Sequence, residues 1–235
     1  MRFNRRLQPF AAISFDLDDT LYDNKPVLIH AETLLLRHLS SLGNVSQLGD
    51  PFWWMQQKQQ LLQQQPQLAQ CTTASRLATL KQGLAALQLS NSEQLATDAM
   101  AKFLHWRSDI HIAPAVIELL QDLAAQYPLA VITNGNANVR QFLPQIPFAT
   151  VLAAGQDGPM KPDPTLFQRC CKQLNIAPAQ LLHIGDHPDS DIAGAINAGC
   201  QAVWLSPQYG GTPRPAGSVL PTATISSLEA LRQLL

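Results

Sequence analysis

Two patterns of hydrophobic and polar positions alternate along the chain, and together they predict a sheet covered by helices. Short runs of apolar residues are typical of buried strands, whereas apolar residues that recur every three or four positions indicate amphipathic helices. Strands are predicted at 13–15, 128–133, 149–154, 181–185, 201–206 and 223–225. Helices are predicted between and after them at 114–126, 164–174, 192–198 and 226–235. Strands that alternate with helices predict an α/β fold with a parallel, doubly wound sheet.

Residues 24–108 differ from the rest of the chain because their periodicity is helical throughout. Four helices are predicted there, which are 27–39, a stretch between Pro51 and Pro66, 74–87, and a last one that ends near Trp106. The opening strand has no neighbour in sequence to pair with, so it must join the strands that follow residue 108. The chain is therefore predicted to be an α/β core, 1–23 and 109–235, interrupted by an all-α domain, 24–108.

Polar, small and acidic residues gather directly after three of the predicted strands. The strings are FDLDDT (15–20), ITNGN (132–136) and IGDHPDSD (184–191). In open parallel sheets a ligand binds outside the carboxyl ends of the strands, so these strings are predicted to meet at one site. Clustered carboxylates are costly at the edge of a core unless they are paired, and they therefore indicate a bound cation or a reacting group. An Asp-rich turn that caps a helix is the alternative for the first string.

Composition narrows the class of partner. Charged residues make up 14% of the chain and the formal net charge is -1, which argues against nucleic acid or a membrane surface as the main partner. A signal peptide and a membrane span are not expected, because neither an h-region nor a run of about 18 apolar residues occurs. The four cysteines show no metal-binding spacing, so reduced thiols and a cytoplasmic location are predicted. Monomer and homodimer both stay open.

Four motifs occur in order along the chain, and any one of them alone would be weak evidence. They are FDLDDTL (15–21), ITNGN (132–136), Lys161 in the string KPDPTLF, and GDHPDSD (185–191). Together they resemble the haloacid dehalogenase superfamily, and within it the phosphatases with a helical, C1-type cap inserted after the first motif. The resemblance covers about 10–24 and 110–206. It implies a Rossmann-like core, a cap formed by 24–108, and Mg²⁺-dependent hydrolysis of a small phosphate ester.

The resemblance implies distinct roles for the acids of the first motif. Asp16 would be the nucleophile that forms an aspartyl phosphate, which splits one difficult hydrolysis into two easier steps. Asp18 would be the general acid and base, and period-2 alternation in an extended strand would place it on the same side as Asp16. Asp19 would point away from them and make structural hydrogen bonds.

A magnesium site is implied by the first and fourth motifs together. Asp16, Asp186 and the backbone carbonyl of Asp18 would hold Mg²⁺, which prefers a few carboxylates together with water and phosphate oxygens. Three roles are possible for Asp191. It would support the metal from the outer shell, form an ion pair with Lys161, or cap the helix over Ile192.

The resemblance also assigns the phosphate site. Thr133 and the backbone amides near Asn134 and Gly135 would hold phosphate oxygens, although an ordinary turn is an equally good reading of Asn134 and Gly135. Lys161 would neutralise the charge that builds on the phosphoryl group. His183, within a predicted strand, is expected to be a hydrogen-bonded core residue.

Other chemistries of the same superfamily are less well served by these residues. Cleavage of a carbon–halogen bond would leave Asp18 and Asp186 without a purpose, and a phosphonatase would need a Schiff-base lysine that the helical domain does not convincingly supply. Sugar phosphate or phosphoglycolate phosphatase, phosphomutase, and a phosphate-binding module without turnover remain as alternatives.

The helical domain is expected to choose the substrate, and it contains Trp53, Trp54 and Trp106. These tryptophans either pack inside the helical bundle or line a cavity for an aromatic ligand. Three strings are similar to the proteobacterial phosphatases that act on flavin mononucleotide and on the phosphoribitylamino-pyrimidine of riboflavin synthesis. They are WRSDIHI, ITNGNA and LNIAPAQLLHIGD.

Overall fold

The computed structural model describes residues 1–205 and 217–235, and the chain divides into two compact units. One unit consists of Met1–Asn24, His111–Gly135 and Phe142–Leu235, and the other of Lys25–Ile110 and Asn136–Gln141. Residues 207–221 are rich in glycine and proline, which predicts a loop, and this segment lies outside the described residues as far as residue 216. Within the described part of the chain, no helix combines the length and the apolar character needed to cross a membrane.

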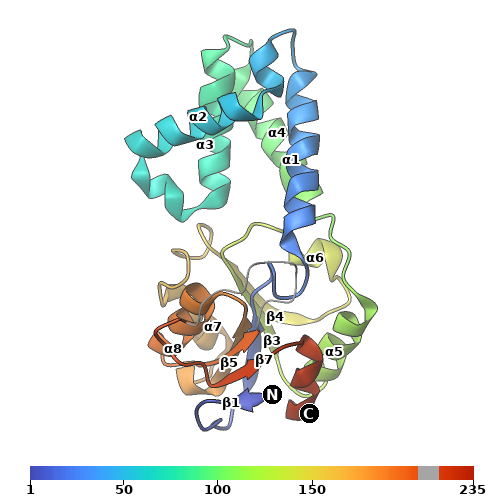
Figure 1. Ribbon diagram of the computed structural model, residues 1–235, viewed down its shortest axis with the longest axis vertical. Helices are drawn as coiled ribbons and strands as arrows, with labels where there is room; N and C mark the ends of the chain where they lie inside the picture. Colours follow the sequence, from blue (N-terminus) through green and yellow to red (C-terminus); the bar gives the residue numbers. More distant parts are fainter. Residues whose placement is uncertain (206–216) are drawn as a thin grey trace. The chain divides into compact units, whose positions relative to one another are not determined.

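The first unit is built on a twisted sheet whose strands are parallel except at one edge (Figure 1). Its strands are β1 (Arg2–Phe3), β2 (Ala12–Phe15), β3 (Leu129–Thr133), β4 (Phe148–Ala153), β5 (Leu181–Gly185), β6 (Gln201–Leu205) and β7 (Ala223–Ile225). Their order across the sheet is β1-β7-β6-β5-β2-β3-β4. The predicted α/β fold with a parallel, Rossmann-like sheet is confirmed, and β1, which pairs antiparallel with β7, was not predicted.

The first long strand lies in the middle of this sheet. β2 pairs in parallel with β5 on one side and with β3 on the other, although more than a hundred residues separate it from each. All four residues of β2 and all five of β3 and of β5 are buried, as expected for strands covered on both faces. The carboxyl ends of these three strands therefore lie at one edge of the sheet.

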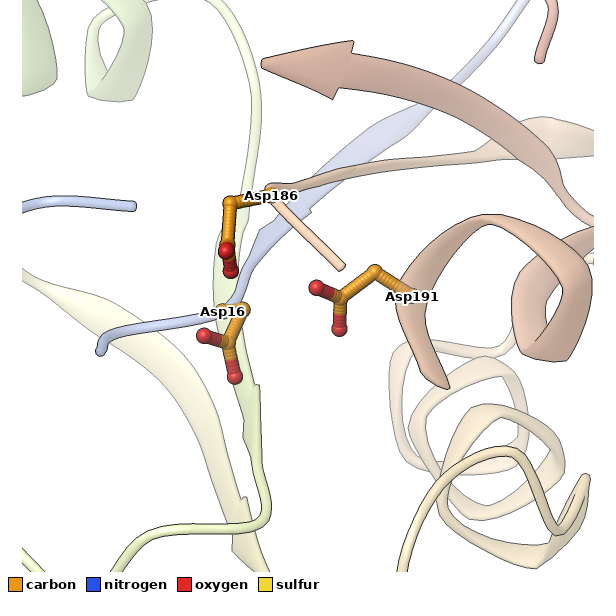
Figure 2. Close-up of side chains that lie close together, drawn as sticks. All are labelled: Asp16, Asp186 and Asp191. Carbon is orange, nitrogen blue, oxygen red and sulfur yellow. The ribbon is translucent and has the colours of Figure 1, made fainter. Parts of the chain in front are cut away.

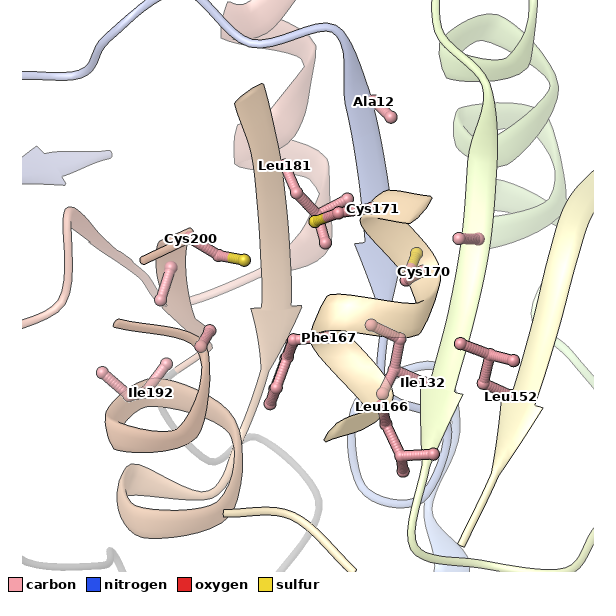
Figure 3. Packing of buried hydrophobic residues seen from close by; sticks show 13 residues of the cluster. Ala12, Ile132, Leu152, Leu166, Phe167, Cys170, Cys171, Leu181, Ile192 and Cys200 are labelled. Carbon is pink, nitrogen blue, oxygen red and sulfur yellow. The ribbon is translucent and has the colours of Figure 1, made fainter. Parts of the chain in front are cut away.

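Helices cover both faces of the sheet (Figure 1). They are α5 (Pro114–Ala124), α7 (Thr165–Leu174), α8 (Gly194–Asn197), the short turns η3 (Pro178–Gln180) and η4 (Pro188–Ala193), and the C-terminal 3₁₀ turn η5 (Leu228–Leu234). Helix α7 buries Leu166, Phe167, Cys170 and Cys171 against the strands, as Figure 3 shows. Two predicted helices differ in form, since 226–235 is largely 3₁₀ and the segment expected at 192–198 is a π-helical turn followed by α8.

The second unit contains the helical elements of the insertion. They are α1 (Asn24–Ser40), η1 (Ser46–Gly49), α2 (Pro51–Gln64), η2 (Pro66–Gln70), α3 (Thr72–Ala86) and α4 (Ser92–Arg107), and α6 (Val139–Phe142) follows β3. Trp54 is buried in the core of this bundle, where its indole nitrogen donates to the carbonyl of Leu48 at 3.0 Å. A Cβ at Gly83 would lie 2.3 Å from the Trp54 ring, so a glycine is needed for α3 to pack on it. Trp53 and Trp106 are partly buried against the same core.

Candidate active site

Three carboxylates converge at the carboxyl edge of the sheet (Figure 2). Asp16 directly follows β2, Asp186 directly follows β5, and Asp191 lies on the π-helical turn η4. One oxygen of each lies within 4.8 Å of the others, and the residues are only 7%, 5% and 1% exposed, respectively. Because β2 and β5 are adjacent and parallel, residues that are 170 positions apart in sequence are placed side by side.

Lys161 joins two of these carboxylates. Its ammonium nitrogen lies 2.7 Å from Oδ1 of Asp16, 2.6 Å from Oδ1 of Asp191, and 2.6 Å from the carbonyl oxygen of Ile132. The side chain of Asn134 fixes the backbone of the lysine, accepting from its amide at 2.8 Å and donating to its carbonyl at 2.9 Å. The side chain of Asn134 therefore holds the Lys161 loop. Only the backbone of Asn134 would be available to bind phosphate.

The ionisation of the site follows from burial and pairing. Burial raises the pKa of Asp16 well above its usual value, and the nearby Lys161 offsets that only in part. For Asp191 the pKa is lowered, because the ammonium of Lys161 and the hydrogen bond from His183 outweigh the cost of burial. The pKa of Lys161 is raised, since two carboxylates oppose the effect of burial. The pair of Lys161 and Asp191 is thus held charged.

Asp191 is held by three hydrogen-bond donors. Its Oδ1 accepts from Lys161 and faces Nε2 of His183 at 3.4 Å, while its Oδ2 accepts from the backbone amide of His187 at 2.9 Å. The N-cap of η4 is His187, whose Nδ1 accepts from the backbone amides of Asp189 and Ser190. The structure thus shows Asp191 paired with Lys161, whereas the helix-capping reading would have required its side chain at the N-cap.

The remaining acids of the first motif lie beyond the strand. β2 ends at Phe15, so strand alternation does not govern the direction of Asp18, and the period-2 argument does not apply to it. Its Oδ1 accepts from the hydroxyl of Tyr22, and its Oδ2 would lie 2.7 Å from a Cβ at Gly135. Asp19 has a positive φ of 59° and accepts from the backbone amide of Asn24 at 3.0 Å, which is a structural hydrogen bond.

Thr133 and Gly135 form a turn beside Asp18. Thr133 is the last residue of β3 and is buried, and its Oγ1 accepts from the backbone amide of Gly135 at 3.0 Å. A side chain at Gly135 would push into the Asp18 carboxylate, so the absence of a Cβ lets that acid reach the turn. The structure therefore brings Asp18 to the second motif, as the implied acid of a phosphate site would require.

The carboxylate oxygens of this site are suitable ligands for a divalent cation. If all three carboxylates are ionised, the ammonium of Lys161 leaves two negative charges in a buried place, which is costly without a counterion. Carboxylate oxygens are hard ligands of the kind that Mg²⁺ prefers. Because Asp191 is already occupied by three donors, Asp16 and Asp186 are the side chains best suited to a direct bond.

Two features of the site escaped sequence reasoning. Tyr22 carries no signal except its place four residues after Asp18, and the turn that brings them together forms after the strand has ended. Ser14 reads as an interruption of an apolar strand, yet its hydroxyl lies 2.9 Å from Nδ1 of His183. A serine and a histidine in two otherwise apolar strands were the available signal, and it became interpretable when the register paired them.

Comparison with known proteins agrees with this geometry. A family model of haloacid dehalogenase-like hydrolases matches residues 10–199. The chain is 33% identical over 238 residues to 5-amino-6-(5-phospho-D-ribitylamino)uracil phosphatase YigB of Escherichia coli (strain K12), with the whole of both chains covered. It is 31% identical over 123 residues to N-acylneuraminate-9-phosphatase of Rattus norvegicus, covering 50% of this chain and 49% of that protein.

Among solved structures, one described as 2-haloacid dehalogenase from Pseudomonas syringae pv. Tomato DC3000 superposes with a TM-score of 0.85 at 34% identity. That match covers 96% of this chain and 97% of the other. The family model, the full-length relative and the superposition coincide on the core that carries Asp16, Lys161 and Asp186. The chain belongs to the haloacid dehalogenase-like hydrolases.

Proposed function

We propose that this protein is a Mg²⁺-dependent phosphomonoester hydrolase that works through an aspartyl phosphate on Asp16. The observation that carries the proposal is the presence of two acids, Asp16 and Asp18, in different surroundings. Asp16 lies against Lys161 and Asp186, whereas Asp18 lies beside the Thr133–Gly135 turn. A nucleophile and a separate proton donor are what transfer of a phosphoryl group from an alcohol requires.

Asp16 would attack phosphorus in line with the leaving alkoxide, forming the Asp16 O–P bond as the P–O bond of the ester breaks. Lys161, whose ammonium contacts Oδ1 of Asp16, would orient the nucleophile and neutralise charge on the phosphoryl oxygens. Thr133 and the backbone amides of the turn that follows it would hold those oxygens. The Gly135 amide, now bonded to Thr133, would exchange that partner for phosphate.

Asp18 would give its proton to the leaving alkoxide and then take one from the water that hydrolyses the aspartyl phosphate. The hydroxyl of Tyr22 donates to its Oδ1, which leaves Oδ2 directed at the turn. A positioned acid of this kind typically contributes about 10²- to 10⁴-fold to the rate.

Mg²⁺ would be held by Asp16, Asp186 and the backbone carbonyl of Asp18, with Asp191 supporting Lys161 from outside. When bound, the ion supplies the positive charge that lets a carboxylate approach a phosphate dianion. The indole nitrogen of Trp204 donates to the backbone carbonyl of Asp186 at 2.8 Å and so steadies the start of the loop after β5.

The substrate would be a phosphorylated ribityl-substituted heterocycle, with 5-amino-6-(5-phospho-D-ribitylamino)uracil and flavin mononucleotide as the leading compounds. This rests on the full-length match to the Escherichia coli phosphatase, which includes the helical insertion, whereas the mammalian N-acylneuraminate-9-phosphatases match about half of the chain. In this proposal residues 24–108 form the domain that selects the substrate, and 1–23 and 109–235 form the domain that performs the chemistry.

Phosphate release from p-nitrophenyl phosphate tests the reaction. Wild type with Mg²⁺ should turn over, Asp16→Asn should not, and chelation with EDTA should stop the wild type. Equal rates for wild type and Asp16→Asn would refute the proposal.

Substrate choice is tested separately with a panel of flavin mononucleotide, the phosphoribitylaminouracil, ribose 5-phosphate and phosphoglycolate. The first two should have the highest kcat/KM, and equal values across the panel would refute the assignment.

Halide release from 2-chloropropionate should be absent. Release that persists without Mg²⁺ and in Asp18→Asn would instead favour a dehalogenase.

A further inference from the structure

We propose that His183 is a positioning residue for the nucleophile, acting through Asp191 and Lys161. The inference rests on the proposed phosphatase function and adds a residue to its machinery. His183 lies on β5, three residues before Asp186, and is 0% exposed. Fully buried core positions are usually occupied by apolar side chains. A fully buried imidazole with two polar partners therefore indicates a specific role for its hydrogen bonds.

A continuous chain of contacts leads from the sheet to the nucleophile. Ser14 Oγ lies 2.9 Å from Nδ1 of His183, whose Nε2 lies 3.4 Å from Oδ1 of Asp191. The same Oδ1 accepts from Lys161 at 2.6 Å. Lys161 in turn donates to Oδ1 of Asp16 at 2.7 Å, which closes the path from the histidine to the reacting carboxylate.

The partners determine the tautomer of the imidazole. Both oxygens of Asp191 accept hydrogen bonds, Oδ1 from Lys161 and Oδ2 from the backbone amide of His187, so the ring nitrogen that faces the carboxylate is the donor, and Nε2 carries the hydrogen. Nδ1 of a neutral ring is then an acceptor, and the Ser14 hydroxyl donates to it. Every polar atom of the ring is thereby used, and the donor to Asp191 is directed by a serine on the neighbouring strand.

The surrounding packing holds the ring in place. The register of β2 and β5 pairs Ser14 directly with His183. The ring of Phe167 on α7 packs edge-on against the imidazole, with centroids 5.0 Å apart and planes at 85°. Gly185 lies two residues further along the strand, where a Cβ would be 2.3 Å from Cγ of Asp191, so the space that the glycine leaves open is filled by that carboxylate.

Asp191 needs this second donor on Oδ1 because Lys161 is shared. The ammonium divides its hydrogens among Asp16, Asp191 and the carbonyl of Ile132. Without His183 the carboxylate would keep a single donor on Oδ1, and it could turn about its bond to Cβ and draw Lys161 away from Asp16. The expected defect is therefore in the rate of attack, with substrate binding preserved.

Three variants test this role. His183→Leu removes the donor and leaves an apolar side chain of similar size, His183→Gln keeps an N–H near the position of Nε2, and His111→Gln, at an exposed residue outside the helical insertion, is the control. With p-nitrophenyl phosphate and Mg²⁺, His183→Leu should lose roughly 10- to 100-fold in kcat with little change in KM. His183→Gln should recover most of that loss, which a purely structural role would not produce. A folded His183→Leu protein with wild-type kcat would refute the proposal.

A double-mutant cycle separates action through Asp191 from a general weakening of the core. If His183 acts through Asp191, the double variant His183→Leu with Asp191→Asn should be no slower than Asp191→Asn alone. Losses that multiply would refute the proposal.

The hydrogen bond itself is tested without turnover, by ¹⁵N–¹H correlation of the histidine side chains in the metal-free protein. The His183 signals, assigned by their loss in His183→Gln, should show protonated Nε2 and unprotonated Nδ1. The opposite tautomer would refute the proposal whatever the activity. A wild type without Mg²⁺-dependent activity would refute the proposed function and this role together, whereas an active wild type with an unaffected His183→Leu would refute this role alone.

Discussion

Nζ of Lys161 lies 2.7 Å from Oδ1 of Asp16, and both residues are buried. The contact joins the end of β2 to the loop that precedes α7, 145 residues later in the chain. Burial disfavours the ionised form of Asp16, and the contact places a cation beside that carboxylate. The ion pair is therefore a structural element of the edge of the sheet as well as part of the proposed chemistry.

Replacing Lys161 by Met should both destabilise the fold and stop turnover. The change leaves Asp16 and Asp191 buried without their ammonium, and removal of one partner of a buried ion pair costs about 3–5 kcal/mol. Urea unfolding in metal-free buffer measures the loss. Lys172→Met, on the exposed side of α7, should stay within about 0.5 kcal/mol of wild type. Equal unfolding free energies for the two variants would contradict the prediction.

Gly135→Ala should reduce catalysis far more than stability. The added methyl would lie 2.7 Å from Oδ2 of Asp18 and 3.3 Å from Oγ1 of Thr133, so the proposed acid must move off the turn. A fall in kcat of at least about 10²-fold is expected if Asp18 supplies the proton. Gly43→Ala is a matched control, because its new methyl would meet its nearest neighbour at an ordinary 3.5 Å. Wild-type kcat in Gly135→Ala would show that Asp18 is not the acid.

Mg²⁺ should stabilise the folded protein, since it would relieve the repulsion among Asp16, Asp186 and Asp191. A ligand of the folded state at 100 times its Kd adds about 2.7 kcal/mol, which a thermal melt with and without Mg²⁺ resolves. Asp186→Asn should lose the shift, and Asp98→Asn, on the exposed surface of α4, should keep it. The idea fails if Asp186→Asn responds to Mg²⁺ as the wild type does.

Acid should weaken the metal-free protein partly through His183. Burial lowers the pKa of this imidazole below its ordinary 6.5, so on acidification the unfolded chain takes up a proton before the folded one. Its contribution is complete above about pH 6.5 and is lost as the pH falls toward the folded pKa, with a slope of at most about 1.4 kcal/mol per pH unit. Asp16 changes stability in the opposite direction but is present in every variant.

Urea unfolding of wild type and His183→Gln at pH 7 and pH 5 checks this. The wild type should lose more free energy of unfolding between the two than the variant does. His111→Gln, on an exposed residue, should follow the wild type. Parallel losses in wild type and His183→Gln would exclude the contribution of His183.

The pattern of apolar runs was sufficient to predict the long strands, because a strand buried on both faces must be apolar throughout. β3, β5 and β7 were predicted to within one residue. β1 could not be predicted, since its two residues, Arg2 and Phe3, carry no burial pattern and pair only after β7 provides an edge. The π-helical turn at Pro188–Ala193 was also missed, because a helix was predicted there only from residue 192.

The sequence by itself determined the fold class, because strand burial and strand ends are local properties of the chain. Asp16, Lys161 and Asp186 were named as candidate site residues through the resemblance of their strings to the family motifs, and the structure shows that they lie close together. The tertiary structure decided how they are connected. It placed Asp18 beside Gly135, although β2 ends at Phe15. It also showed that the carboxylate of Asp191 accepts from Lys161 and does not cap a helix.

The structure also linked His183 to the nucleophile through the register of two strands that are distant in sequence. Ser14 and His183, Asp16 and Lys161, and Asp18 and Gly135 are pairs separated by more than 100 residues, whereas Lys161 and Asp191 are 30 residues apart. The distances within such pairs are set by sheet order and packing, which the local pattern of a chain does not encode.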